Sequence, residues 1–149
     1  MDFFTNVYAK DVMTRNVRCV NPATSVRELS EIFIEHNISG APVVEHGKLI
    51  GFVSQTDIVE LDLHLQSDNS LESRMEETGG FVQDIMVPVE LVARDTDSLA
   101  SIIETMCRER IHRLVVLDAA DTICGILTTM DVMCYFRRIY QNTASGEKV

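Results

Sequence analysis

A seven-residue motif occurs twice in the chain, and this duplication restricts the possible folds more than any other feature. The first copy spans residues 51–57 (GFVSQTD) and the second spans residues 125–131 (GILTTMD). Each copy consists of a glycine, two apolar residues, a hydroxyl residue, two further residues and an aspartate. Each follows an apolar residue and leads into a helical pattern of apolar residues. The motif therefore predicts a strand whose end presents a hydroxyl and a carboxylate where the next helix begins.

Further similarities place the two motifs inside two longer repeats. Residues 8–13 and 81–86 both end in an acid, an aliphatic residue and a methionine, at an offset of 73. Self-similarity of this kind decides an architecture, because each copy is one structural unit. After each of these lead-in segments we expect a short strand, at residues 17–20 and at residues 89–92.

A helix and a hairpin follow in each repeat. Ser25 and Glu28 have the spacing of a capping box at a helix start. Apolar residues then recur on one helical face in both repeats. We expect hairpins at residues 41–53 and 114–127, each with polar turn residues between two apolar runs. The second turn is one residue longer, and a loop tip tolerates such a change without a shift in strand register.

Two repeats of this size are expected to share a core. A repeat of about 60 residues is marginal alone, because it buries only about 60% of its unfolded surface. We therefore predict an α/β (α+β) fold of two pseudo-twofold repeats, each strand-helix-strand-strand-helix, packed sheet to sheet. The expected divisions are 1–66 for the first repeat with its lead-in, 67–80 for an acidic linker, 81–141 for the second repeat and 142–149 for a flexible tail.

The last helix carries more apolar residues than one stripe requires. Cys134 and Tyr135 add to the pattern formed by Val132, Met133 and Phe136. An exposed apolar patch favours association, so we expect a homodimer. The alternative is that this helix covers only its own sheet.

Charge and composition argue against several classes of partner and site. The formal net charge of −10 argues against nucleic acid and against anionic lipid surfaces. No apolar run is long enough to span a membrane and the N-terminus lacks a secretory signal, which predicts a cytoplasmic protein. The four cysteines lack paired spacing, so no zinc site is expected, and Cys19, Cys107 and Cys124 are interpreted as buried thiols. We find no nucleophile–base pair and no phosphate-binding loop followed by lysine, which argues against an enzyme.

The order of these elements resembles a tandem pair of CBS domains, also called a Bateman module. The resemblance rests on the lead-in ending in methionine, the strand, the capped helix and the repeated motif, which together cover residues 8–140. It implies a free-standing regulatory module that binds an adenosine compound (AMP, ADP, ATP or S-adenosylmethionine) in clefts between the repeats. Binding would change the conformation and signal to a partner protein. The adenine nucleotide would be a regulatory ligand, and no cofactor would be required.

The resemblance also implies which residues contact the ligand. Asp57 and Asp131 would accept hydrogen bonds from the two vicinal hydroxyls of a ribose, and bonds to a charged acceptor are stronger than neutral ones. Ser54 and Thr128 would donate to phosphate, close to a helix N-terminus. The candidate nucleotide-binding residues are Ser39, Gly40, Ser54, Thr56, Asp57, His112, Arg113, Thr128 and Asp131. Capping of a helix is the alternative role for each aspartate and each hydroxyl residue.

The two candidate sites are unequal. The second repeat supplies His112 and Arg113, and arginine can bind a phosphate through two donors. The first repeat has small neutral residues there, but it keeps Thr56 where the second has Met130. If one site alone binds a phosphorylated adenosine, we expect it to be the second. These departures also favour an alternative function, a structural homodimerisation module with degenerate, empty clefts.

Overall fold

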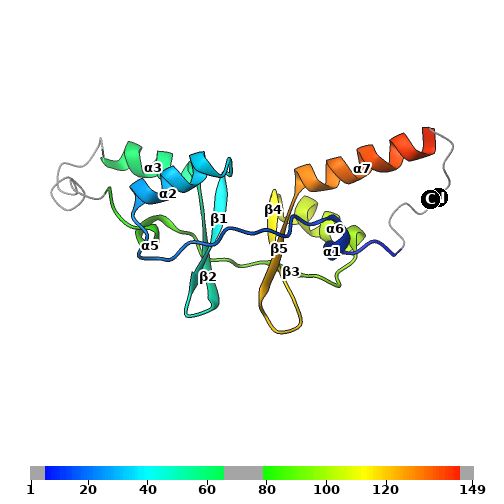
Figure 1. The fold of residues 1–149 in the computed structure, drawn as a ribbon, viewed down its shortest axis with the longest axis horizontal. Coiled ribbons are helices and arrows are strands. Elements are labelled where there is room, and N and C mark those ends of the chain that lie inside the picture. The colour runs from blue at the N-terminus through cyan, green and yellow to red at the C-terminus, as the bar shows by residue number, and fades with distance from the viewer. Residues whose placement is uncertain (1–5, 66–78, 145–149) are drawn as a thin grey trace. The chain divides into compact units, whose positions relative to one another are not determined.

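A computed structural model describes residues 6–65 and 79–144 of the chain (Figure 1). The described residues form short helices and strands in alternation, which confirms the mixed α+β class. In chain order the elements are α1 (Ala9–Val12), α2 (Val26–Glu35), β1 (Gly40–Glu45), β2 (Lys48–Ser54), α3 (Gln55–Leu65), α5 (Val82–Ile85), β3 (Val92–Arg94), α6 (Leu99–Glu109), β4 (Arg113–Leu117), β5 (Ile123–Thr128) and α7 (Thr129–Ala144). Most of the expected acidic linker lies outside the described residues, as do residues 145–149 of the expected tail. Residues 142–144 of that tail belong to α7.

The chain divides into two compact units that do not coincide with the two sequence repeats. The first-motif unit is Arg18–Glu90, and the second-motif unit combines Met1–Val17 with Leu91–Val149. Each unit therefore contains the lead-in that precedes the other repeat, unlike the boundaries expected at 1–66 and 81–141. The two lead-ins are so similar in sequence that the repeat pattern does not indicate which motif each one contacts.

Backbone hydrogen bonds fix each lead-in in its unit. In the second-motif unit, Leu99 donates to the carbonyl of Val7 at 2.8 Å. In the first-motif unit, Val82 donates to the carbonyl of Thr24 at 2.9 Å, and Val26 donates to that of Gly80 at 2.9 Å. Each lead-in helix thus lies beside the start of a longer helix.

Each unit has its own apolar core. In the first-motif unit the buried core residues are Val20, Leu29, Phe33, Ala41, Val43, Val53 and Val82. In the second-motif unit they are Ala9, Met13, Ala93, Leu99, Ile102, Met106, Leu114, Val116, Leu127 and Val132. Helices α2 and α6 supply their predicted apolar stripes to these cores. Their starts are capped by Ser25, whose Oγ accepts from the Glu28 N–H at 3.1 Å, and by Ser98, whose Oγ accepts from the Ser101 N–H at 3.2 Å.

Both predicted hairpins are present, and their turns differ. Strands β1 and β2 are antiparallel and are joined through His46 and Gly47, with φ angles of 49° and 76°. Two successive positive φ angles are typical of a type I′ turn, which matches the twist of the flanking strands.

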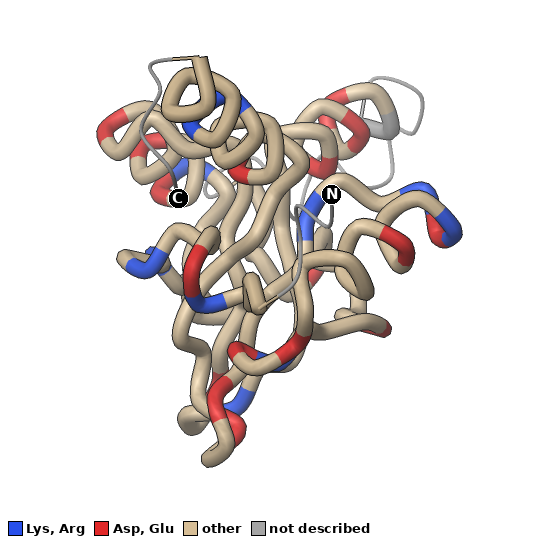
Figure 2. The backbone as a smooth tube through the Cα atoms, turned by 90° about the vertical axis from the view of Figure 1, so that its right-hand side faces the viewer, with Lys and Arg blue, Asp and Glu red and all other residues tan. Residues whose placement is uncertain are grey.

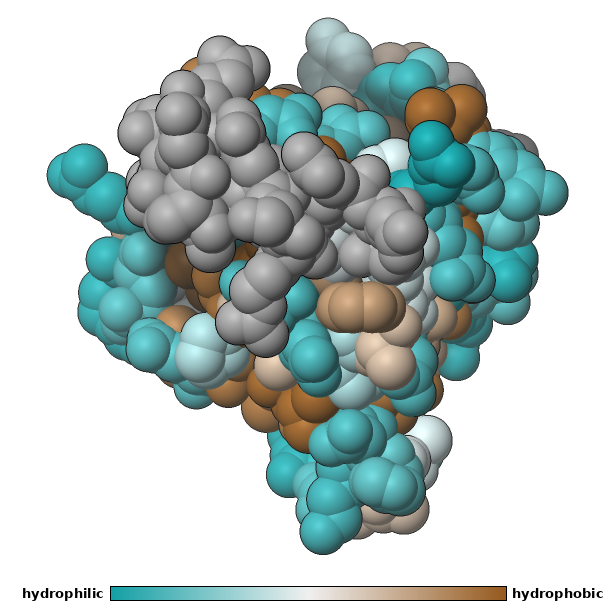
Figure 3. All heavy atoms as spheres, turned by 90° about the vertical axis from the view of Figure 1, so that its left-hand side faces the viewer, coloured by the Kyte–Doolittle hydropathy of each residue, from teal (hydrophilic) through white to brown (hydrophobic). Residues whose placement is uncertain are grey.

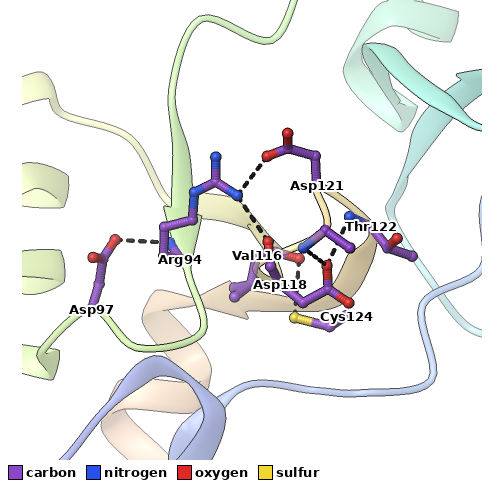
Figure 4. A network of polar contacts seen from close by, with 8 residues as sticks. Arg94, Asp97, Val116, Asp118, Asp121, Thr122 and Cys124 are labelled. Carbon is purple, nitrogen blue, oxygen red and sulfur yellow. Dashed lines mark hydrogen bonds and ion pairs between the residues drawn. The ribbon is translucent and has the colours of Figure 1, made fainter.

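The longer turn between β4 and β5 is organised by polar contacts (Figure 4). The Asp118 carboxylate accepts from the N–H groups of Ala120 at 2.8 Å and Thr122 at 3.0 Å. Arg94, at the end of the neighbouring strand β3, donates to the Asp118 carbonyl at 2.8 Å and pairs with Asp121 at 2.6 Å. The extra turn residue is therefore held by its own contacts and does not disturb the strands.

The predicted first strand of each repeat was misplaced or too long. In the second repeat the strand is β3, Val92–Arg94, which pairs in parallel with β4, and not residues 89–92. In the first repeat it is reduced to one bridge between Val20 and Val43. The error arose because the apolar run before β3 is exposed, whereas its small residue Ala93 is the buried one.

The interpretation of three cysteines as buried thiols was wrong for two of them. Cys19 and Cys107 are exposed, and only Cys124 is half-buried. The Cys124 thiol donates to the Val116 carbonyl at 3.5 Å (Figure 4). An apolar residue pattern therefore predicted thiol burial poorly both within helix α6, for Cys107, and outside any helix or strand, for Cys19.

Charged residues of both signs are distributed along the described part of the chain. Figure 2 shows Lys and Arg interspersed with Asp and Glu along the backbone. Among the described helices, none is long and apolar enough to cross a membrane.

Candidate functional site

The second copy of the motif forms a closed set of hydrogen bonds at the junction of β5 and α7. Asp131 Oδ2 accepts from the backbone N–H of Thr128 at 2.7 Å and from its Oγ1 at 2.6 Å. The same Oγ1 accepts from the Asp131 N–H at 3.2 Å. Thr128 therefore caps the helix, and Asp131 closes the cap from the third helical position, as in a capping box.

The first copy repeats two of these three bonds at the junction of β2 and α3. Asp57 Oδ2 accepts from the Ser54 N–H at 2.6 Å and from the Ser54 Oγ at 2.8 Å. The hydroxyl residue, and not the aspartate, is again the residue that precedes the helix. The capping alternative thus describes how both motifs fold. Ser54 and Thr128 precede the helix, and each aspartate bonds to its hydroxyl residue from the third helical position.

Each motif carboxylate can accept hydrogen bonds in addition to those of the cap. Both aspartates are half-buried, and their Oδ2 atoms are occupied by the motif itself. A carboxylate has about four positions at which it can accept a hydrogen bond, two on each oxygen. The motif therefore holds an oriented carboxylate at the start of a helix, and its cap bonds use Oδ2 and not Oδ1.

The first strand of each hairpin brings other candidate residues close to the motif. Gly40 pairs with Ser54 across β1 and β2, and Arg113 pairs with Thr128 across β4 and β5. The residue before each also contacts the motif, because the His112 carbonyl accepts from the Thr129 N–H at 3.0 Å.

The first copy has the equivalent carbonyl contact and one further candidate residue. The Ser39 carbonyl accepts from the Gln55 N–H at 3.0 Å. Thr56 is exposed in the first turn of α3, next to Asp57. The structure therefore gathers the nine candidate residues into two sets, one in each unit.

Thr14 is a site residue that the sequence analysis missed. Its Oγ1 donates to Asp131 Oδ1 at 3.1 Å, although 117 positions separate the two residues. Thr14 follows the lead-in methionine, so the sequence signal was a hydroxyl at the end of a repeated segment. The interaction could not be found from spacing, because this lead-in contacts the second motif.

Arg137 and Arg138 also lie near Asp131 and were not predicted. They line a cavity of about 330 Å³ together with Asp11, Asp131 and Tyr135. The Arg138 guanidinium lies 5.3 Å from the centre of the Tyr135 ring, a cation–π distance. Neither His112 nor Arg113 lines this cavity. The surroundings of Asp131 therefore include two cationic side chains from its own helix.

No group of three or more His, Cys, Asp or Glu side chains within the described residues is arranged to hold a metal ion. Each set contains a carboxylate and hydroxyl groups, and the second set also contains the arginine Arg113.

Comparison with known proteins identifies the family. The family model of the CBS domain matches residues 9–64 and 82–138, which is most of the chain. The chain belongs to the CBS domain family. Both matches end within the last helix of a repeat, so the chain carries a tandem pair of CBS domains.

CBS pairs of known structure resemble this one throughout. The structure of CBSX2 from Arabidopsis thaliana in complex with AMP has a TM-score of 0.76 and 32% identity, over 91% of this chain and 99% of that one. Protein MJ1225 from Methanocaldococcus jannaschii has a TM-score of 0.73 and 29% identity, over 88% of this chain and 48% of that one. The chain thus has the fold of a CBS pair.

Sequence relatives include proteins that are longer than this chain. Chloroplastic CBSX2 of Arabidopsis thaliana is 31% identical over 91% of this chain and 66% of its own length. Inosine-5'-monophosphate dehydrogenase of Thermoplasma acidophilum is 25% identical over 82% of this chain and 22% of its own length. The chain spans less than two thirds of the length of the curated relatives it matches first. CBS pairs therefore occur both in free-standing proteins and within enzymes.

Proposed function

We propose that this chain is a regulatory module that binds an adenosine nucleotide and signals to a partner protein by a change of conformation. One observation carries the proposal. Each unit holds a capped carboxylate, Asp57 or Asp131, in the arrangement of the motif, and the similar CBSX2 pair is known in complex with AMP. A carboxylate held in this way can accept the hydroxyl groups of a ribose, and such charge-assisted bonds are strong.

The phosphate of the ligand would be bound by hydrogen-bond donors beside each carboxylate. In the second set these are His112 and Arg113, and in the first it is Thr56. The single hydroxyl donors of Ser54 and Thr128 are already used by Asp57 and Asp131, contrary to the expectation that they donate to phosphate. Ser39 and Gly40 allow close approach of the backbone in the first set. Arginine forms two parallel bonds to phosphate, which supports tighter binding by the second set.

A thermal shift experiment tests the proposal. The full chain is melted with AMP, ADP, ATP and S-adenosylmethionine, and with inorganic phosphate as the control. A ligand present at a hundred times its Kd adds about 2.7 kcal/mol to the free energy of unfolding. For a domain of this size the melting temperature rises by several degrees. No shift with any adenosine compound at millimolar concentration contradicts the proposal.

The same module is proposed to act without catalysis. Asp57 and Asp131 belong to separate units, so the chain offers no acid–base pair at one motif. The dehydrogenase relative shows that a CBS pair can accompany a catalytic domain, and only a domain of that kind would supply turnover. Release of adenosine, phosphate or pyrophosphate from the nucleotides above would contradict this part of the proposal.

A homodimer and a cytoplasmic location complete the proposal. Helix α7 exposes Met130, Met133, Phe136 and Tyr140, which recur at intervals of three or four residues. Figure 3 shows the face at the left of Figure 1, on which smaller brown apolar areas lie among mostly teal hydrophilic side chains. A second copy of the chain is the simplest partner for such a stripe.

Fractionation of cells that express the tagged chain tests the cytoplasmic location, because the relative CBSX2 is named as chloroplastic.

The second candidate function is a structural dimerisation module with empty sites. It is favoured by the capping bonds, which account for the Ser/Thr and Asp residues of both motifs without any ligand. It predicts a dimer that is indifferent to nucleotides. The thermal shift experiment separates the two candidates, because only the regulatory module responds to adenosine compounds.

A further inference from the structure

The two motif carboxylates are bonded differently, although their motifs are equivalent. Asp131 Oδ2 accepts two hydrogen bonds from Thr128, and its Oδ1 accepts a third from Thr14 at 3.1 Å. Asp57 Oδ2 likewise accepts two bonds from Ser54. Its Oδ1 accepts none from any residue that the structure describes.

The difference has its origin in the lead-in segments. Thr14 exchanges two backbone hydrogen bonds with Ile126, both of 2.9 Å. In the other unit Val87 exchanges two bonds of the same length with Phe52. Ile126 and Phe52 occupy the same position, five residues before the motif aspartate. Val87 is therefore the counterpart of Thr14, with a methyl group where Thr14 has its hydroxyl.

The number of free acceptor positions follows from this substitution. Each carboxylate oxygen can accept about two hydrogen bonds, so both Oδ2 atoms are saturated by their caps. Asp57 Oδ1 keeps two acceptor positions that no described residue fills. Asp131 Oδ1 keeps one, because Thr14 uses the other. A ribose presents two vicinal hydroxyl groups. Asp57 Oδ1 can accept a hydrogen bond from both at once. Asp131 Oδ1 can accept from only one of them while Thr14 stays bonded to it.

We infer that Thr14 and Val87 determine how strictly each motif recognises a ribose diol, and that the Asp57 site is the stricter one. The inference rests on the proposed binding of an adenosine nucleotide and adds a specificity to it. At Asp57, loss of the ribose 2′-hydroxyl removes a bond to a charged acceptor. At Asp131, the remaining 3′-hydroxyl can still fill the single free position, so the loss has little effect.

Reciprocal substitutions test the inference. Calorimetry measures the Kd of AMP and of 2′-deoxy-AMP with the full chain. Asp131→Asn isolates the Asp57 site, and Asp57→Asn isolates the Asp131 site. Thr14→Val and Val87→Thr then exchange the two lead-in side chains, while Thr14→Ser keeps the hydroxyl as the matched control.

The expected readout is the ratio of the two dissociation constants at each site. A bond to a charged group is worth roughly tenfold or more in affinity, so 2′-deoxy-AMP should bind the Asp57 site at least about tenfold more weakly than AMP. At the Asp131 site the Kd of 2′-deoxy-AMP divided by the Kd of AMP should be near one in the wild-type chain. The ratio should rise in Thr14→Val and stay at the wild-type value in Thr14→Ser. Val87→Thr should lower the ratio at the Asp57 site.

Different outcomes overturn the inference and the proposed function. Equal ratios at the two sites, unmoved by the exchanged side chains, overturn the inference and leave the proposed function intact. Failure of the wild-type chain to bind AMP overturns the proposed function and the inference with it. If an Asp→Asn variant does not fold, a two-site fit to the wild-type, Thr14→Val and Val87→Thr titrations measures the ratio at each site instead. Equal ratios at the two sites in that fit also overturn the inference.

Discussion

Met13 packs against Gly125, so closely that a Cβ on the glycine would lie 2.8 Å from the Met13 Cγ and 3.1 Å from the Thr14 carbonyl oxygen. Gly51 has the equivalent relationship to Met86 and Val87, with the Val87 carbonyl oxygen 2.9 Å from the added Cβ. The glycine that opens each motif therefore gives the lead-in room to approach strand β2 or β5. In each unit the methionine that ends the lead-in packs against the glycine that opens the motif.

Gly125→Ala should destabilise the protein by about 1–3 kcal/mol, because an extra methyl group in a packed contact forces its neighbours to move. Urea unfolding measures this change. Met13→Ala in the Gly125→Ala background is the control, since the smaller side chain makes room for the Cβ. The combined variant should lose less stability than the two single losses added together. Strict additivity would show that the two residues do not interact.

Asp131→Ala should cost about 1 kcal/mol or more of stability, because it leaves the Thr128 N–H and Oγ1 without their acceptor. Asp131→Asn keeps an oxygen that can accept from the Thr128 N–H, so it should cost less. Thermal melting of both variants checks the order. Equal melting temperatures for Asp131→Ala and the wild type would contradict the capping bonds.

Cys124 should react more slowly with iodoacetamide than Cys107 or Cys134. Burial raises the pKa of the Cys124 thiol, and the nearby Asp95 and Asp118 carboxylates raise it further. A raised pKa lowers the fraction of reactive thiolate at any pH below it, and Cys107 and Cys134 are in addition exposed. Peptide mass spectrometry after brief alkylation of the folded protein at pH 8 gives the order. Alkylation of Cys124 first would contradict its half-buried position.

Met133→Glu should shift the chain from dimer to monomer, because it places a charge in the apolar stripe of α7. Met133 is 63% exposed and Tyr140 77% exposed within one chain. Ile34→Glu is the matched control, since Ile34 is 80% exposed on helix α2 and lies outside the stripe. Sedimentation velocity should show dissociation for Met133→Glu and none for Ile34→Glu. A wild-type chain that sediments as a monomer would contradict the proposed homodimer.

The sequence predicted the elements of this fold well wherever local chemistry decides them. The cap at Ser25, the apolar stripes of α2 and α6 and both hairpins depend on contacts between neighbours in the chain. The same holds for the hydroxyl–carboxylate pairs of the two motifs. Even there, the assignment of Ser54 and Thr128 as the caps needed the coordinates.

What the sequence could not show depends on contacts between distant segments. The lead-ins lie in the unit of the other repeat, and two nearly identical segments offer no local signal for that choice. The bond from Thr14 to Asp131 follows from it and was missed for the same reason. The β3 strand was misplaced because apolar residues at 91 and 92 are exposed and the small Ala93 is buried.

Binding of AMP to the full chain, measured by titration calorimetry, tests the proposed function most directly. The wild-type chain should give saturable heat, and the combined Asp57→Asn and Asp131→Asn variant should lose it while keeping its cooperative unfolding transition. Each charged hydrogen bond that is lost should weaken binding by roughly tenfold or more. Unchanged AMP affinity in the folded double variant, or no heat with the wild-type chain, would contradict the account.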